Sequence, residues 1–265
     1  MNQENLDFLK KSLKFLGFGE KLNADLEDYI KNQPKEFKLS HAGEFKLGEN
    51  TDRVNYRLDF RKSDTSDMYF LNRHEATLKN DDPEKEKMQT FYINKGSGVT
   101  AKEAYNLLSG RAINKDLYTK EGQPYNAWLQ LDLTEKDKNG NHIVKQYSQN
   151  YGFDLEAAVK KYPIKELQTE SEKKTLMESL EKGNLQQVVF VKEGKEVKMF
   201  VEASPKFKNL NVYDTKMEKQ FHGVNQREKQ SPDKSKEQKE SIKPDGENDE
   251  EEKKQKKSKR KGVRV

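Results

Sequence analysis

The sequence predicts an α+β fold: antiparallel sheets in two repeated strand-hairpin-helix units, preceded by an N-terminal helical hairpin and followed by a disordered, charged C-terminal tail. Three observations lead to this class. Two stretches alternate strictly between apolar and polar residues, as half-buried antiparallel strands do. Two glycine turns, at Gly98 and Gly152, are followed at the same spacing by an apolar residue, an N-cap side chain and an alanine. The last 41 residues hold only three aliphatic side chains, Ile242, Val263 and Val265.

These patterns divide the chain into four segments: a helical hairpin (1–35), a first α+β unit (36–117), a second α+β unit with a closing helix and hairpin (118–217), and the tail (218–265). Charge is distributed unevenly over them. From Asn225 to Val265 there are 14 Lys and Arg against 10 Asp and Glu, which leaves 37 against 36 in the rest of the chain. A nearly neutral body directs any nucleic-acid hypothesis to the tail.

The residue inventory argues against several kinds of chemistry. There is no cysteine, which excludes disulfides, thiolate nucleophiles and cysteine-rich zinc sites. The histidines His41, His74, His142 and His222 show no metal-ligand spacing, and no Ser-His-Asp order or paired-carboxylate motif stands out. We therefore predict a protein that is not an enzyme and has no cofactor or metal. The first 20 residues lack a signal peptide's apolar core, so we expect a cytoplasmic protein without a membrane span.

The first segment predicts two helices. Four leucines recur at helical spacing and are followed by a C-capping glycine; these are Leu6, Leu9, Leu13, Leu16 and Gly17. A second amphipathic segment runs from Asn23 to Asn32 and ends before Pro34. Apolar stripes of this kind normally meet the protein's own core, so we expect the hairpin to pack on the body, with docking to a partner as the alternative.

Strand and helix signals follow in order. In the first unit, residues 54–61 alternate without a fault, 68–77 and 88–93 supply neighbouring strands, and the capping box Thr100-Ala-Lys-Glu103 starts a helix that Gly110 ends. In the second unit, residues 125–133 alternate, Asn139-Gly140 signals a hairpin turn before a strand at 143–151, and Asp154 caps a helix that ends before Pro163. A helix at 171–180, a hairpin of 188–192 with 195–201 and a strand at 210–213 complete it.

Nine short segments of the chain carry a family likeness. They are 91–92, 98–108 (GVTAKEAYNLL), 110–112, 125–132 (YNAWLQLD), 151–157 (YGFDLEA), 163–167, 179–184, 202–207 and 211–214. With them the chain resembles a family of uncharacterised proteins from Bacteroidetes that are often encoded among conjugation and mobile-element genes. The resemblance spans roughly residues 5–217. Because the resemblance brings no catalytic motif with it, it implies a genetic setting and no activity.

Two motifs have competing interpretations. Gly96-Ser-Gly98-Val-Thr-Ala101 fits the dinucleotide fingerprint with alanine in the third place, so amides at the helix start could hold the phosphate of a nucleotide in an enzyme. We favour a structural turn, because the second unit keeps only Gly152 there and still caps its helix. Residues 137–142 resemble a calcium loop, yet the glycine stands two places early and Ser148 replaces the closing Glu, so a hairpin turn explains them better.

Trp128 is the first candidate interaction residue. The residues two places away on either side, Asn126 and Gln130, are polar, which places the only tryptophan on the face opposite the leucines of its strand. An exposed aromatic there could stack on bases or dock a protein, whereas burial under a helix is the more usual environment of tryptophan. The predicted interaction face consists of Trp128, Arg53, Arg57 and Arg61.

The basic end of the tail is the candidate nucleic-acid site. Its cations are Lys253, Lys254, Lys256, Lys257, Lys259, Arg260, Lys261 and Arg264. Our leading hypothesis is a non-enzymatic accessory protein of a mobile genetic element that associates with DNA or RNA, or with a nucleoprotein complex, through these cations and without sequence preference. The alternative is a protein-protein interaction module that docks a partner, such as a mobile-element protein, around Trp128, while the tail only solubilises the chain.

Overall fold

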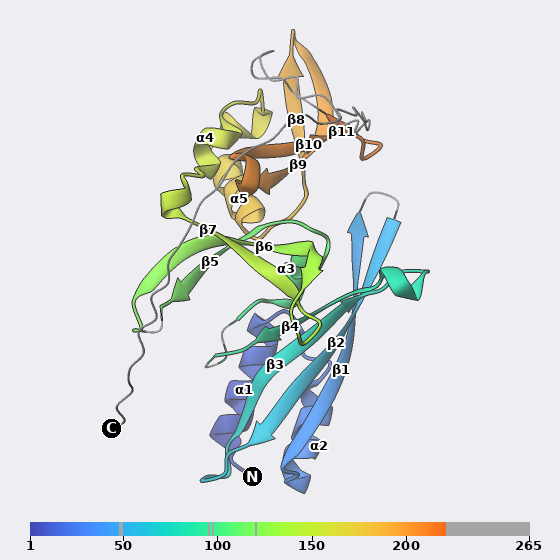
Figure 1. Cartoon of the computed structure of the whole chain (residues 1–265), viewed down its shortest axis with the longest axis vertical. Helices are drawn as coiled ribbons and strands as arrows, with labels where there is room; N and C mark the ends of the chain where they lie inside the picture. The colour runs from blue at the N-terminus through green and yellow to red at the C-terminus, as the bar shows by residue number, and fades with distance from the viewer. Residues whose placement is uncertain (48–49, 95, 97, 120, 221–265) are drawn as a thin grey trace, which may run out of the picture. The chain divides into compact units, whose positions relative to one another are not determined.

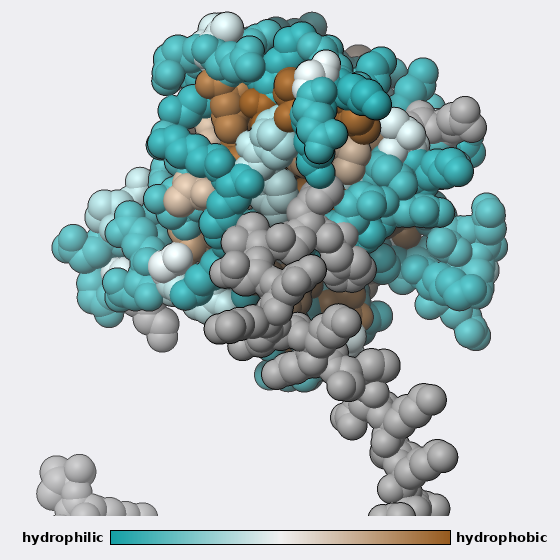
Figure 2. Space-filling view, turned by 90° about the horizontal axis from the view of Figure 1, so that it is seen from above, coloured by the Kyte–Doolittle hydropathy of each residue, from teal (hydrophilic) through white to brown (hydrophobic). Residues whose placement is uncertain are grey.

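Three antiparallel sheets and five α-helices make up the described part of the chain (Figure 1). The computed structural model describes residues 1–47, 50–94, 96, 98–119 and 121–220, and only the backbone of Leu47. Residues 1–222 form one unit, with the boundary to the second unit at Gly223. This architecture confirms the predicted α+β class. Seen from above, the surface is mostly hydrophilic with apolar residues showing between the polar ones (Figure 2), in keeping with a mean hydropathy of −1.19.

The first sheet has the order β1-β2-β3-β4 and carries the N-terminal helices on one face. Its strands are β1 (Glu36–Leu47), β2 (Asn50–Lys62), β3 (Tyr69–Leu78) and β4 (Lys87–Tyr92), and the helices are α1 (Gln3–Phe15) and α2 (Asn23–Asn32). Alternation along β2 decides which side chains face the helices, because neighbouring residues of a strand point to opposite faces. Val54, Tyr56, Leu58 and Phe60 are buried as predicted.

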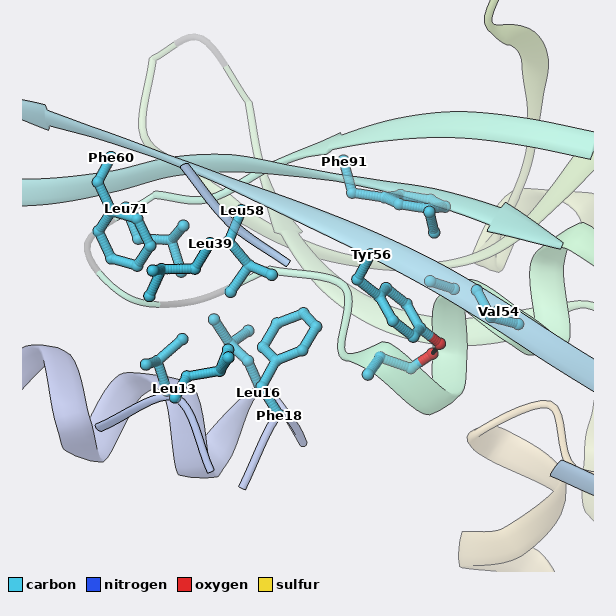
Figure 3. Packing of buried hydrophobic residues seen from close by; sticks show 14 of the residues in the cluster. Leu13, Leu16, Phe18, Leu39, Val54, Tyr56, Leu58, Phe60, Leu71 and Phe91 are labelled. Atoms are coloured by element: carbon cyan, nitrogen blue, oxygen red, sulfur yellow. Dashed lines mark hydrogen bonds between the residues drawn. The ribbon is translucent and has the colours of Figure 1, made fainter. Parts of the chain in front are cut away.

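The N-terminal hairpin packs on this sheet, which confirms the first of its two interpretations. Figure 3 shows Leu13 of α1, Leu16 at its C-cap and the following Phe18 on the side of the sheet that carries Leu58 and Tyr56 of β2. Gly17 follows the helix with φ of +85°, a left-handed conformation that glycine adopts without steric cost. We call the apolar residues buried here cluster one.

The helix α3 (Ala101–Leu108) closes cluster one and begins with the predicted capping box. The Thr100 hydroxyl accepts from the Glu103 amide at 3.3 Å, and the Glu103 carboxylate accepts from the Thr100 amide at 2.8 Å. Gly96 has a positive φ of +78°, whereas space is limited at Gly98: a Cβ there would lie 2.6 Å from Cδ1 of Ile93 and 3.0 Å from the Tyr92 carbonyl oxygen. The turn therefore depends on close packing at Gly98.

The second sheet has the order β5-β6-β7, with β5 (Ile113–Tyr118), β6 (Pro124–Lys136) and β7 (His142–Ser148). The Asn139-Gly140 turn joins β6 to β7 as predicted, and the Asp137 carboxylate accepts from the Asn139 and Asn141 amides. β5 was not predicted. Because β5 pairs with β6, the predicted boundary at residues 117–118 falls inside a strand, and β5 belongs with the second sheet.

The third sheet has the order β11-β10-β9-β8 and encloses a second apolar cluster with two helices. Its elements are α4 (Leu155–Val159), α5 (Glu170–Glu181), β8 (Gln186–Lys192), β9 (Lys195–Ser204), β10 (Asn209–Tyr213) and β11 (Lys219–Gln220), with 3-10 turns at Lys165–Leu167 and Pro205–Phe207. Two further 3-10 turns lie between β3 and β4 (Pro83–Lys85) and after β7 (Gln149–Tyr151). We refer to the second apolar cluster as cluster two. Asp154 caps α4 as Thr100 caps α3, so the capping pattern is shared. Duplication of the whole unit stays a prediction.

His74 gives the fold a testable pH dependence. The ring is fully buried beside Phe18 and Phe91, with Nε2 2.8 Å from the Val99 carbonyl oxygen, so Nε2 carries the hydrogen. Among the described residues Nδ1 has no hydrogen-bond partner. Burial lowers the pKa of His74 below 6.5, and the bond to Val99 only partly offsets this. Protonation would therefore place an unpaired N–H among aromatic rings.

We expect the free energy of unfolding to fall as the pH drops below about 6.5, because His74 then binds a proton in the unfolded chain but stays neutral in the folded chain. His74→Gln keeps an N–H donor and has no titrating ring, so its stability should change less between about pH 7.5 and about pH 5.5. Urea unfolding at a series of pH values measures both slopes. Burial also lowers the pKa of His41 and His142, which contribute equally in both chains. Equal slopes would contradict this assignment.

Candidate functional site

Trp128 is buried, so the predicted docking face around it is wrong. Only 6% of the residue is exposed, and its ring meets Phe153 edge to face with 5.2 Å between centroids. Trp128 belongs to cluster two, which includes Leu155 and Val159 of α4. The next residue, Leu129, belongs to cluster one. The middle of β6 is thus covered on both faces, and the burial that we weighed against exposure is the correct interpretation.

The arginine row lies on the solvent face of β2, in a different sheet from Trp128, and its charges are paired. Arg53 meets Glu44 at 3.2 Å, Arg57 meets Glu75 at 3.0 Å and Arg61 meets Asp64 at 3.2 Å. The side chains are 73%, 42% and 46% exposed. Exposed pairs contribute little to stability, yet each carboxylate neutralises the cation beside it. The positive charges of the row are therefore balanced by neighbouring carboxylates, which disfavours this surface as a binding site for a polyanion.

Geometry disfavours the nucleotide interpretation of residues 96–101. The Ala101 amide at the start of α3 donates to the Leu16 carbonyl at 2.8 Å, and the Thr100 amide donates to Glu103. The Glu103 carboxylate itself sits at this helix end, buried and paired with Lys115 at 3.2 Å. A phosphate would meet a carboxylate there instead of free amides.

A buried polar junction joins the end of α3 to the turn after α5. Asn106 is fully buried, and its Nδ2 donates to the Lys182 carbonyl at 2.6 Å and to Oδ1 of Asn184 at 3.0 Å. Arg111 is 7% exposed; its Nε donates to the Gly183 carbonyl at 3.1 Å, and Nη2 donates to Oδ1 of Asn106 at 2.8 Å. We call Asn106, Arg111 and residues 182–184 the polar junction.

Cations and aromatic rings surround one side of the polar junction. Phe45 and Tyr105 stack with 4.2 Å between centroids, and the Lys102 ammonium lies 4.7 Å from each. The Arg111 guanidinium lies 4.8 Å from the Tyr105 centroid. Contacts of this kind fix a cation without cancelling its charge. We call the cavity of about 240 Å³ beside them the cation cleft; it is lined by Lys46, Lys102, Tyr105, Asn106, Arg111, Asn184, Leu185 and Gln186.

Electrostatics in the cation cleft favour a positive potential. Desolvation and the charge of Arg111 lower the pKa of Lys102, while Asp52 acts in the opposite direction. Asp52 accepts from the Tyr105 hydroxyl at 2.8 Å, and burial followed by this bond raises the pKa of that hydroxyl. The cations that line the cleft are Lys46, Lys102 and Arg111. Within the described residues, none of these three side chains has a carboxylate oxygen within 4.0 Å.

Sequence reasoning missed the cation cleft. Lys102 lies inside the capping box and Arg111 directly follows Gly110, and neither position by itself indicates a binding site. Their neighbours Lys46 and Asn184 come from distant parts of the chain, so no local spacing brings them together. The predicted tail site, from Lys253 to Arg264, lies outside the described residues, as does His222.

Other kinds of site find no support in the described residues. They contain no group of three or more His, Asp or Glu side chains placed to hold a metal ion. None of the helices described is long and apolar enough to span a membrane. In comparisons with known proteins, no family model, no curated protein and no solved structure matches the chain.

Trp128 fluorescence reports directly on the burial described above. As the only tryptophan, it should emit at short wavelength and resist acrylamide quenching in the folded protein. Trp128→Ala should lower the free energy of unfolding by about 3–5 kcal/mol, since it opens a cavity in cluster two. Tyr118→Ala, at a residue 70% exposed, is the control and should change it by less than about 0.5 kcal/mol. Quenchable, red-shifted emission from the native state would contradict the packing.

Proposed function

We propose that the protein is a non-enzymatic, cytoplasmic accessory protein of a mobile genetic element that associates with nucleic acid through the basic end of its tail. The charge distribution carries this proposal. Residues 253–265 hold eight cations and no acid, while the rest of the chain before residue 225 is nearly neutral. Counterion release from phosphates supplies most of the affinity of such a segment, and it needs no fixed geometry.

The ion pairing of the body supports the same assignment. Arg53, Arg57 and Arg61, the cations that sequence reasoning offered as a second surface, each have a carboxylate within 3.2 Å. A polyanion that bound there would have to displace those carboxylates. The tail has an analogous competitor in its sequence: the acidic block of Glu247 and residues 249–252 directly precedes the basic end. Opposite blocks attract within a Debye length of about 8 Å at physiological salt, so this block should mask the cations partly.

We expect the full chain to bind duplex or single-stranded DNA without sequence preference, with a slope of log affinity against log salt no steeper than about −7 for eight contacts. Replacing the eight Lys and Arg of residues 253–264 by Gln should abolish binding and leave the melting temperature unchanged. Neutralising the acidic block should strengthen binding. Fluorescence anisotropy at several salt concentrations measures affinity and slope together.

The triple variant Arg53→Gln, Arg57→Gln, Arg61→Gln serves as the matched control, because it removes body cations that are already paired. Its DNA affinity should equal that of the unaltered chain. If the tail variant kept its affinity and salt slope while the triple variant lost them, the nucleic-acid site would lie on the body and the proposal would be wrong.

The second candidate function is a protein-protein interaction module. The burial of Trp128 rules out docking there, but one other surface supports this function. An apolar groove of about 450 Å³ runs between α1 and β3, where Phe8, Met68 and Phe70 are 48%, 38% and 45% exposed. Exposed apolar surface of this kind is typical of interaction sites. A partner that stays bound after nuclease treatment and is lost in Phe70→Asp would favour this module over the tail; loss on nuclease treatment alone would favour the tail.

A further inference from the structure

We propose that the cation cleft on the folded body binds a phosphate group, as a second anion site that is independent of the tail. The ligand chemistry is a phosphate monoester or a free phosphate, held by Lys46, Lys102 and Arg111. The proposal rests on the geometry of described residues and does not depend on the function assigned to the tail.

The first argument is that the three cations lack carboxylate partners. Elsewhere on the body, exposed arginines such as Arg57 and Arg73 pair with acids at 3.0 Å or less. In the cation cleft, Lys102 and Arg111 are held by aromatic rings instead, and their like charges repel each other. Asp52 is the acid that acts on Lys102, and its carboxylate is engaged by the Tyr105 hydroxyl. An anion in the cleft would relieve the repulsion.

The second argument is that Arg111 is preorganised. Its guanidinium is fixed by the Gly183 carbonyl and by Asn106, so little rotamer entropy is lost when it binds a ligand. Arginine presents five N–H donors in a planar fork that matches the oxygens of a phosphate. The bonds to Gly183 and Asn106 use two of these donors.

The Glu202 carboxylate is engaged by neutral hydrogen-bond donors. Glu202, 9% exposed, accepts from the Tyr213 hydroxyl at 2.8 Å and from Nδ2 of Asn211 at 2.8 Å. Burial and then Glu202 raise the pKa of Tyr213, and Arg111 lowers it. The polar side chains of Asn184 and Gln186 complete the lining of a cavity large enough for a phosphate group.

The experiment is a titration of the full-length, nitrogen-15-labelled chain with inorganic phosphate at constant ionic strength, followed by NMR. The Arg111 Nε–H and the side-chain amides of Asn106 and Asn184 should shift and saturate. Lys46→Gln with Lys102→Gln removes two cations at exposed residues, so the fold should persist, and should weaken binding on the order of tenfold or more. Lys11→Gln, on the exposed side of α1, is the charge-matched control and should bind like the unaltered chain.

A 5′-phosphorylated dinucleotide and its unphosphorylated form separate the two sources of phosphate. Tighter binding of the phosphorylated dinucleotide than of inorganic phosphate would identify the end of a nucleic acid as the ligand; equal binding would identify free phosphate, and either result supports the site. The proposal is overturned if the three reporter signals do not move with phosphate, or if they move equally in the double lysine variant. Spectra of both variants without ligand verify that the fold is intact.

Discussion

The polar junction is the constraint on which the arrangement of the described chain depends. Cluster one includes α3, and cluster two includes α5, so the hydrogen bonds from Asn106 and Arg111 to residues 182–184 tie the two clusters at buried groups. A buried donor or acceptor that lacks a partner lowers the stability of the folded state. The side chains of Asn106 and Arg111 and the carbonyl groups of residues 182–184 therefore depend on each other for their hydrogen bonds. Gly183 shows how closely they meet. A Cβ there would lie 2.6 Å from the Ala112 carbonyl oxygen, and φ is +76°. Only glycine meets both conditions without strain.

Local patterns predicted elements well and surfaces poorly. The alternation along β2, the capping box at Thr100 and the Asn139-Gly140 turn are decided within a few residues, and the structure confirms each. β5 was not predicted because its residues 114–116 are all polar or charged, so the alternation of apolar and polar residues that indicates a strand is missing there. Trp128 lies on the predicted side of its strand, but the interpretation of that side as an exposed interaction face is wrong, because polar neighbours normally mark a solvent face. Here Gln130 reaches the Gly110 carbonyl at 2.8 Å, so that face is covered despite its composition.

Charge acts differently in the three parts of this protein. On the open face of β2, acids and bases alternate and pair, which leaves no net attraction for a polyanion. In the cation cleft, rings and carbonyls hold lysine and arginine side chains whose charge stays available. In the tail, eight cations follow an acidic block along the sequence. The proposed association with nucleic acid draws on the tail, whereas the proposed phosphate site draws on fixed geometry, so the two can be separated by mutation.

The central structural claim is that the polar junction and β6 together join both clusters into one cooperative unit, and hydrogen exchange tests it most directly. Leu58→Ala opens a cavity in cluster one, at a residue that is 0% exposed, and should cost about 3–5 kcal/mol. If the two clusters form one cooperative unit, the amides of β9 in cluster two should lose the same free energy of protection as those of β2. Loss of protection in β2 with unchanged protection in β9 would show that the clusters unfold separately and would contradict this account.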